Sequence, residues 1–147
     1  MPQSQALLGQ GEELVILTRS FRYPGADMAT LDVTGHVASG PDGVSVGGDH
    51  SWFAEAAVLG PRDEDLAVVV LDTGDPPRLL FQRVDFHGQQ LHSTVEASDG
   101  LPPEAGEVRG AALARAADRF AVMFVASTEV GPDASGELYV RTIQCDF

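Results

Sequence analysis

The chain has 147 residues, of which 44% are hydrophobic and 21% charged, and its formal net charge is −13. These values fit one globular domain over residues 1–147. All nine basic residues are arginine, and they are too few to form a basic stripe for nucleic acid or an anionic membrane. The single cysteine, Cys145, excludes an internal disulfide bond. We therefore expect the partner to be a cation or a basic protein surface.

The location of the protein is predicted from two segments. Residues 1–11 have no cationic start and no apolar core, so they do not look like a signal peptide. The longest apolar run, at 66–71, is too short to span a membrane. We expect a cytoplasmic protein without direct membrane insertion.

Sixteen glycines and nine prolines separate short apolar runs, a pattern typical of short strands joined by turns. Gly-Pro-Asp-Gly at 40–43 suits a type I turn. The continuous apolar run at 66–71 predicts a strand buried on both faces. Residues 54–59 are expected to form a loop or short helix, and 111–119 a short helix or an irregular strand. Strands are expected at 14–21, 28–39, 44–46, 51–53, 66–71, 79–87, 91–97, 120–126 and 137–147.

The strands at 79–87 and 91–97 are predicted to pair as a hairpin with one core face and one solvated face. The core face holds Val84, Phe86, Leu91 and Val95. The solvated face holds Arg83, Asp85, His87, His92, Thr94 and Glu96. With about eight short strands and at most one short helix, the sequence predicts an all-β fold, a two-sheet β-sandwich. A barrel is the less favoured alternative.

Three short motifs suggest catalysis, and each has a more ordinary explanation. The Asp-Thr-Gly run at 72–74 occurs once, whereas aspartic proteases need two such carboxylates, so we interpret it as a strand end and a turn. Cys145 is more typical of a small core residue than of a nucleophile. The run His50-Ser51-Trp52 has no matching acid, so it is not a catalytic triad, and we expect Trp52 to serve as a buried core residue. We expect no enzymatic activity.

Metal ligands are a further possibility. Asp85, His87 and His92 share one predicted hairpin face and suit zinc, although a solvated face carries such residues routinely. Acidic loops are the more interesting candidates, because calcium is held by several oxygen ligands from neighbouring loops. The acidic residues concerned are Asp27, Asp32, Asp42, Asp49, Asp63, Glu64 and Asp65.

The order of these segments resembles the tellurite-resistance (TerD-like) stress-protein family over most of the chain. The segments that carry the resemblance are LLGQGEEL at 7–14, LDVTGHVA at 31–38, PDG at 41–43, DHSWF at 49–53, DEDL at 63–66, FHGQ at 86–89, 120–125, and 137–147 with Arg141. The resemblance implies a β-sandwich without catalysis that works with protein partners in metal or oxidative stress. It also implies weak calcium binding, with Asp32, Asp49, Asp63 and Glu64 as ligands.

Three departures from the family pattern weaken the calcium prediction. Thr30 stands where the family has an Asp, and Gly47 or Gly48 replaces another acid. Arg62 lies beside the proposed site, where its positive charge repels a cation. The fold is therefore predicted more strongly than the ion.

Two other functions remain open. The first is a small β-barrel enzyme or ligand carrier with a pocket near Trp52, His50 and the polar hairpin face, which requires an enclosed pocket lined by aromatic residues. The second is a structural or assembly subunit, which requires an exposed apolar patch or an open edge strand.

Overall fold

The computed structural model describes residues 5–10, 13–19, 26–32, 34–44, 51–60, 65–72, 77–85, 89–101, 107–127 and 136–144. Side chains are described for 29–32, 34–37, 60, 65–72, 77–85, 89–101, 108, 110–127 and 136–144. Within these ranges the chain forms eleven strands and no helix. They are β1 (Gln5–Gln10), β2 (Glu13–Arg19), β3 (Ala26–Leu31), β4 (Val37–Val44), β5 (Ser51–Leu59), β6 (Leu66–Asp72), β7 (Arg78–Val84), β8 (Val95–Glu96), β9 (Glu107–Arg115), β10 (Arg119–Ser127) and β11 (Glu137–Gln144).

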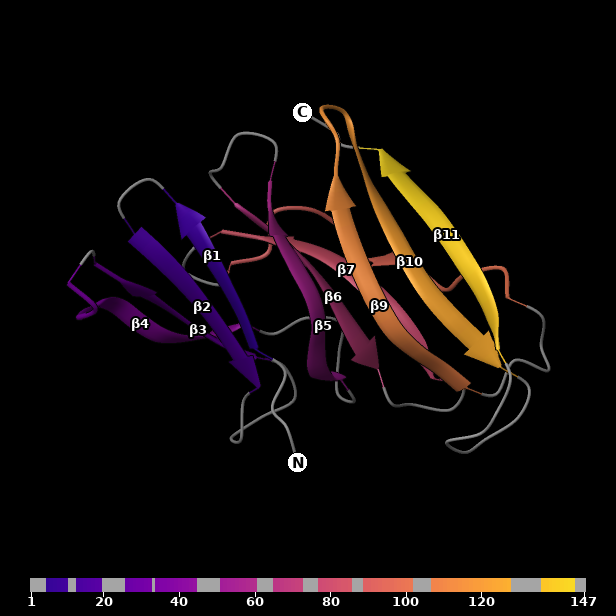
Figure 1. Cartoon of the computed structure of the whole chain (residues 1–147), viewed down its shortest axis with the longest axis horizontal. Helices are drawn as coiled ribbons and strands as arrows, with labels where there is room; N and C mark the ends of the chain where they lie inside the picture. The colour runs from indigo at the N-terminus through magenta and orange to yellow at the C-terminus, as the bar shows by residue number, and fades with distance from the viewer. Residues whose placement is uncertain are drawn as a thin grey trace.

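The described strands form three antiparallel sheets, each built from strands that are consecutive in the sequence (Figure 1). Their orders are β1-β2-β3-β4, β5-β6-β7-β8 and β11-β10-β9. The predicted all-β class is confirmed. The part of the chain that the structure describes contains no helix long and apolar enough to cross a membrane.

One core cluster joins the β5–β8 sheet to the β9–β11 sheet. The first sheet contributes Ala67, Val69, Leu79 and Phe81, with Ala97 beside it, and the second contributes Val108, Phe120, Val122, Phe124 and Ala126. The rings of Phe81 and Phe120 meet with their centroids 5.1 Å apart. The two-sheet sandwich itself stays a prediction, because the described strands divide into three sheets.

Strand β6 is buried on both faces, as its apolar run predicts. Every residue from Leu66 to Val70 is at most 1% exposed. The strand lies between β5 and β7 in its sheet, so its backbone groups pair on both sides. Branched residues suit this position because they pack well on both faces of a pleated sheet.

The turn of the β3–β4 hairpin lies at a different place from the predicted one. The turn predicted at 40–43 is wrong, because these residues lie within β4, and the chain reverses at 32–36 instead. Gly35 has φ 85°, and its N–H donates to the carbonyl of Asp32 over 3.0 Å. Pro41 falls where the β3–β4 register shifts, and β4 ends the order of its sheet, a position that tolerates a missing N–H donor.

Two alanine-rich segments are strands. The loop or short helix predicted at 54–59 is wrong, because all of 51–59 is β5, with register shifts near Trp52 and Glu55. The segment at 111–115 belongs to β9, in agreement with the strand alternative, and a turn at 116–118 leads into β10. Pairing with β6 and β10 therefore outweighs the helix propensity of alanine.

The predicted hairpin after β7 is antiparallel, but its second arm is short. Of this second arm only β8 pairs with β7, through Phe81 opposite Val95, and a single bridge joins Val84 to Gln90. The assignment of faces is partly wrong. The Arg83 side chain is only 13% exposed, whereas Leu91, predicted in the core, is 46% exposed.

Candidate functional site

A buried ion pair closes one end of the core between the two sheets. The Nε–H of Arg83 donates to Oδ2 of Asp65 over 2.7 Å, and the Asp65 side chain is only 5% exposed. Arg83 lies on β7, and Asp65 directly precedes β6. Because Arg83 is registered opposite Ala67, Asp65 is its diagonal neighbour across the two strands.

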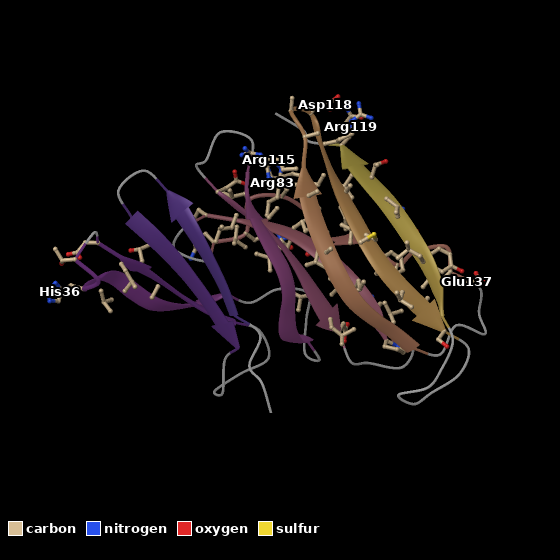
Figure 2. All side chains as sticks on the ribbon, in the orientation of Figure 1. His36, Arg83, Arg115, Asp118, Arg119 and Glu137 are labelled. Atoms are coloured by element: carbon tan, nitrogen blue, oxygen red, sulfur yellow. The ribbon has the colours of Figure 1, made fainter. Side chains whose placement is uncertain are left out.

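The backbone at Gly60 completes this end of the core. The N–H of Gly60 donates to the Asp65 carbonyl over 2.8 Å, and Arg115 of β9 donates to the Gly60 carbonyl. A Cβ atom at position 60 would overlap the Asp65 carboxylate, so only glycine fits here. Figure 2 shows Arg83 and Arg115 at the same end of the molecule.

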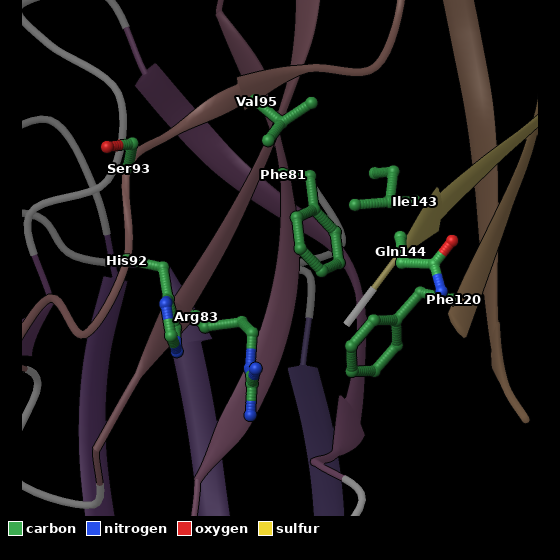
Figure 3. Close-up of a pocket in the computed structure, with 8 residues that line it drawn as sticks. All are labelled: Phe81, Arg83, His92, Ser93, Val95, Phe120, Ile143 and Gln144. Atoms are coloured by element: carbon green, nitrogen blue, oxygen red, sulfur yellow. The ribbon is translucent and has the colours of Figure 1, made fainter. Parts of the chain in front are cut away.

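A pocket of about 230 Å³ opens beside Arg83. Figure 3 shows Arg83 and His92 near one another, with the phenylalanine rings and Ile143 on the other side. The guanidinium carbon of Arg83 lies 5.9 Å from the centre of the Phe120 ring, within the range of a cation–π contact. The pocket is lined by Phe81, Arg83, His92, Ser93, Val95, Phe120, Ile143 and Gln144.

Amide hydrogen bonds hold the segment that carries His92 over the pocket. The side-chain amide of Gln82, which is buried, donates to the His92 carbonyl over 2.8 Å, and Thr94 donates its hydroxyl to the other end of the same amide. Gln90 also donates to the His92 carbonyl, over 2.7 Å. The loop is therefore tied to β7 by the buried Gln82 amide, whose hydrogen bonds are costly to break. Such a pocket suits a small planar ligand with a polar edge.

Two residues of the predicted polar hairpin face, Arg83 and His92, line this pocket, but it opens on the core side of the hairpin, where Phe81 is registered opposite Val95. The backbone of Trp52 belongs to β5, but its side chain and all of His50 lie outside the described residues.

Asp32, the one predicted calcium ligand that the structure describes, organises a turn. Its Oδ1 accepts hydrogen bonds from the Thr34 hydroxyl at 2.6 Å, the Thr34 N–H at 2.9 Å and the His36 N–H at 3.1 Å. The hydrogen bond from the Thr34 side chain, followed by that from the His36 backbone, lowers the pKa of Asp32 below its ordinary value. Asp49, Asp63 and Glu64 lie outside the described residues, so the calcium site stays a prediction.

The other candidate ligands and motif residues either make local hydrogen bonds, are exposed, or lie outside the described residues. Asp85 accepts the N–H of Gln89 over 2.9 Å, and His92 is exposed, while His87 lies outside the described residues. Asp72 ends β6, as predicted, and its carboxylate accepts a hydrogen bond from Arg78 over 2.9 Å. Cys145 also lies outside the described residues. Among the side chains that are described, no three His, Cys, Asp or Glu residues gather as metal ligands.

The outer face of the β9–β11 sheet, which points away from the core, is apolar. Val140 of β11 is registered opposite Met123 of β10, which is in turn opposite Ala112 of β9. Met123 is 42% exposed, Leu138 64% and Val140 63%. We use the name outer face for Ala112, Ala114, Ala121, Met123, Val125, Leu138, Val140 and Thr142.

None of these eight residues is acidic or basic, although the chain carries 22 acidic residues, and the basic residues Arg109, opposite Val125, and Arg119, before Ala121, are registered on the same side. Beyond one end of it, at the β9–β10 turn, Arg119 pairs with Asp118 over 2.8 Å. Figure 2 shows Glu137 at the opposite end of the sheet. The side chain of Glu137 accepts the hydroxyl of Tyr139, a half-buried residue whose ring stacks on the core residue Phe124.

The outer face was not predicted from the sequence, although β11 carries a signal for it. In β11 both alternating sets carry apolar residues, Leu138 and Val140 in one and Tyr139 and Ile143 in the other. Such a strand is usually buried on both faces. In the structure the Tyr139–Ile143 side is half-buried against the core, while the Leu138–Val140 side is exposed.

Comparison of the chain with protein-family models, curated proteins and solved structures finds no match. The resemblance to the tellurite-resistance family therefore stays a prediction.

Proposed function

We propose that the protein is a non-catalytic binding module that docks a protein partner on the outer face of its β9–β11 sheet. The observation that supports this proposal is the exposure of Met123, Leu138 and Val140 side by side on neighbouring strands. Contiguous apolar surface on a sheet is typical of interaction sites. Covering each of these half-exposed side chains is worth on the order of 1 kcal/mol.

The charge distribution supports the same surface. A chain with a net charge of −13 is repelled over most of its surface by other acidic proteins. A face whose eight residues include no acidic one is where a partner meets the least of this repulsion. The wider setting, a cytoplasmic metal or oxidative stress response with weak calcium binding, rests on the family resemblance and the acidic loops.

Photo-crosslinking tests the proposal. A benzoylphenylalanine residue is placed at Val140 and, as a matched control, at Val37, which is 60% exposed on β4 of another sheet. The full chain is irradiated in its native cell, and adducts are separated by mass. We expect a discrete adduct from position 140 that is absent from position 37. Equal adduct yields at the two positions, or none at either, would reject docking on the outer face.

A second candidate function is that of a small-ligand carrier, and the pocket beside Arg83 and His92 favours it. Aromatic rings on one side and nitrogen-bearing side chains on the other suit a small aromatic acid. Titration with benzoate, followed by NMR, should shift the resonances of Val95 and Ile143 and leave Ala112 unchanged. Resonances that stay fixed at millimolar benzoate would count against this function.

A further inference from the structure

We infer that two copies of this chain join edge to edge along β11, which places their outer faces side by side and so enlarges the docking surface; the inference rests on the proposed docking function. In the order β11-β10-β9, strand β11 ends the sheet and has a partner strand on one side only among the described residues. Figure 1 shows it at the margin of the molecule, away from the β1–β4 sheet. An edge strand presents backbone donors and acceptors that pair readily with another strand.

Two-fold symmetry restricts how two copies of β11 can pair. In an antiparallel pair, residues directly opposite each other point to the same side of the sheet. A two-fold axis perpendicular to the sheet must then pass beside a residue that faces its own counterpart. The axis therefore lies at one residue of β11. The residue before it in one copy is then opposite the residue after it in the other copy.

An axis at Tyr139 gives complementary pairs. It places Leu138 opposite Val140 of the second copy on the outer face, and it places Glu137 opposite Arg141 on the inner side. Each contact occurs twice because of the symmetry. An axis at Arg141 would instead bring two guanidinium groups together, and an axis at Val140 would leave Glu137 opposite Ile143. Charge complementarity thus selects the register centred on Tyr139.

The existing contacts of the two charged residues are compatible with this register. Glu137 accepts the Tyr139 hydroxyl over 2.9 Å, and Arg141 donates one Nη1 hydrogen bond to the Asp99 carbonyl over 2.8 Å. A carboxylate has about four acceptor positions and a guanidinium five donors, so each holds capacity for a further partner. The pairing would join two three-stranded sheets into one of six strands with a continuous apolar face.

Charge reversal with compensation tests the inference. The full chain and its variants are compared by sedimentation velocity over a hundredfold range of concentration. We expect a monomer–dimer equilibrium whose dissociation constant rises at least about tenfold for Glu137→Arg and for Arg141→Glu, since like charges then face each other twice. The double variant, which restores opposite charges in reversed order, should recover most of the affinity. Thermal melts of each variant show whether it is folded, and Glu137→Gln serves as a milder variant.

The outcomes separate this inference from the proposed function. Val140→Lys should abolish the dimer, and the matched Val37→Lys should leave it unchanged. A wild-type chain that sediments as a monomer at every concentration, or a dimer unaffected by both charge reversals, overturns the inference. A monomer that still gives a position-140 adduct with a different chain leaves the docking function standing. A monomer without any such adduct overturns both.

Discussion

The Nε atom of Arg83 lies 2.7 Å from Oδ2 of Asp65, and the two side chains are only 13% and 5% exposed. At the other end of the same two strands, Arg78 pairs with Asp72 over 2.9 Å, but the Arg78 side chain is 44% exposed. An Arg–Asp ion pair thus lies at each end of the β6–β7 pair of strands, one buried and one partly exposed to water. The comparison gives a matched test of what burial does to an ion pair.

Arg83→Met should destabilise the fold by about 3 kcal/mol, because it leaves the buried Asp65 carboxylate without its cation. Arg78→Met should cost about 1 kcal/mol or less, because water already screens that pair. Urea unfolding of the two variants measures the difference. Adding Asp65→Asn to Arg83→Met should recover part of the loss, since neither charge then remains. Equal losses for the two arginine variants would contradict the distinction.

Gly60→Ala should cost about 2 kcal/mol, because the new methyl group would displace the Asp65 carboxylate from its place beside Arg83. In the Arg83→Met background the same change should cost clearly less, since the ion pair is already broken. Gly110→Ala is the control. Gly110 has φ 60° and open space around it, so its cost of about 1 kcal/mol comes from the left-handed backbone alone and should not depend on Arg83. A double-mutant cycle by urea unfolding checks this, and full additivity at position 60 would contradict it.

Thr34→Val should raise the pKa of Asp32 towards its ordinary value, because the hydroxyl hydrogen bond is the largest contribution holding this pKa down. Carboxyl ¹³C chemical shifts followed with pH measure the change. Asp118, whose pKa is lowered by its hydrogen bond with Arg119, should titrate as before. An unchanged Asp32 titration would contradict this expectation and show that the backbone N–H groups alone hold the pKa of Asp32 down.

The same hydrogen bonds give Asp32 a pH-dependent contribution to stability. Its pKa is lower in the folded than in the unfolded chain, so the contribution is complete above the unfolded pKa of about 4 and is lost as the pH falls through the folded pKa. In thermal melts, Thr34→Val should therefore be less stable than the wild type at neutral pH. The difference should narrow in acid below pH 4. A difference that stays constant with pH would argue against this linkage.

Calcium should raise the melting midpoint by a few degrees relative to a chelator, with magnesium giving a smaller rise, if the acidic loops retain an ion site. Asp32→Asn and Asp63→Asn should each abolish the rise. Asp32→Asn keeps an oxygen that can accept the Thr34 and His36 hydrogen bonds, so it removes the charge without removing the turn. Asp118→Asn, on a turn of another sheet, is the control. No calcium-dependent shift in the wild type would mean that the ion site is lost.

The local sequence pattern was sufficient to predict an element where one hydrophobic pattern dominated the segment. The apolar run at 66–71 is a buried strand because six consecutive apolar residues can be covered only between two neighbouring layers. The all-β class followed from many short runs of this kind separated by glycine and proline.

Other features depended on residues far away in the chain. The alanine-rich segments became β5 and β9 because β6 and β10 supply hydrogen-bonding partners, which outweighs a small helix preference. The turn formed at 32–36 because Asp32, Thr34 and Gly35 together satisfy its backbone, a combination that competes with the equally turn-like Gly-Pro-Asp-Gly.

The sequence by itself determined the class of fold, the buried centre of the β5–β8 sheet and the excess of negative charge, because each arises from composition or from a short repeating pattern. Tertiary structure alone decided that Arg83 is buried against Asp65 and that Leu138, Val140 and Met123 share an exposed face. The physical reason is that burial depends on which sheet covers a strand. That choice is made by pairing and packing between segments far apart in the chain, and no local window of sequence contains both partners.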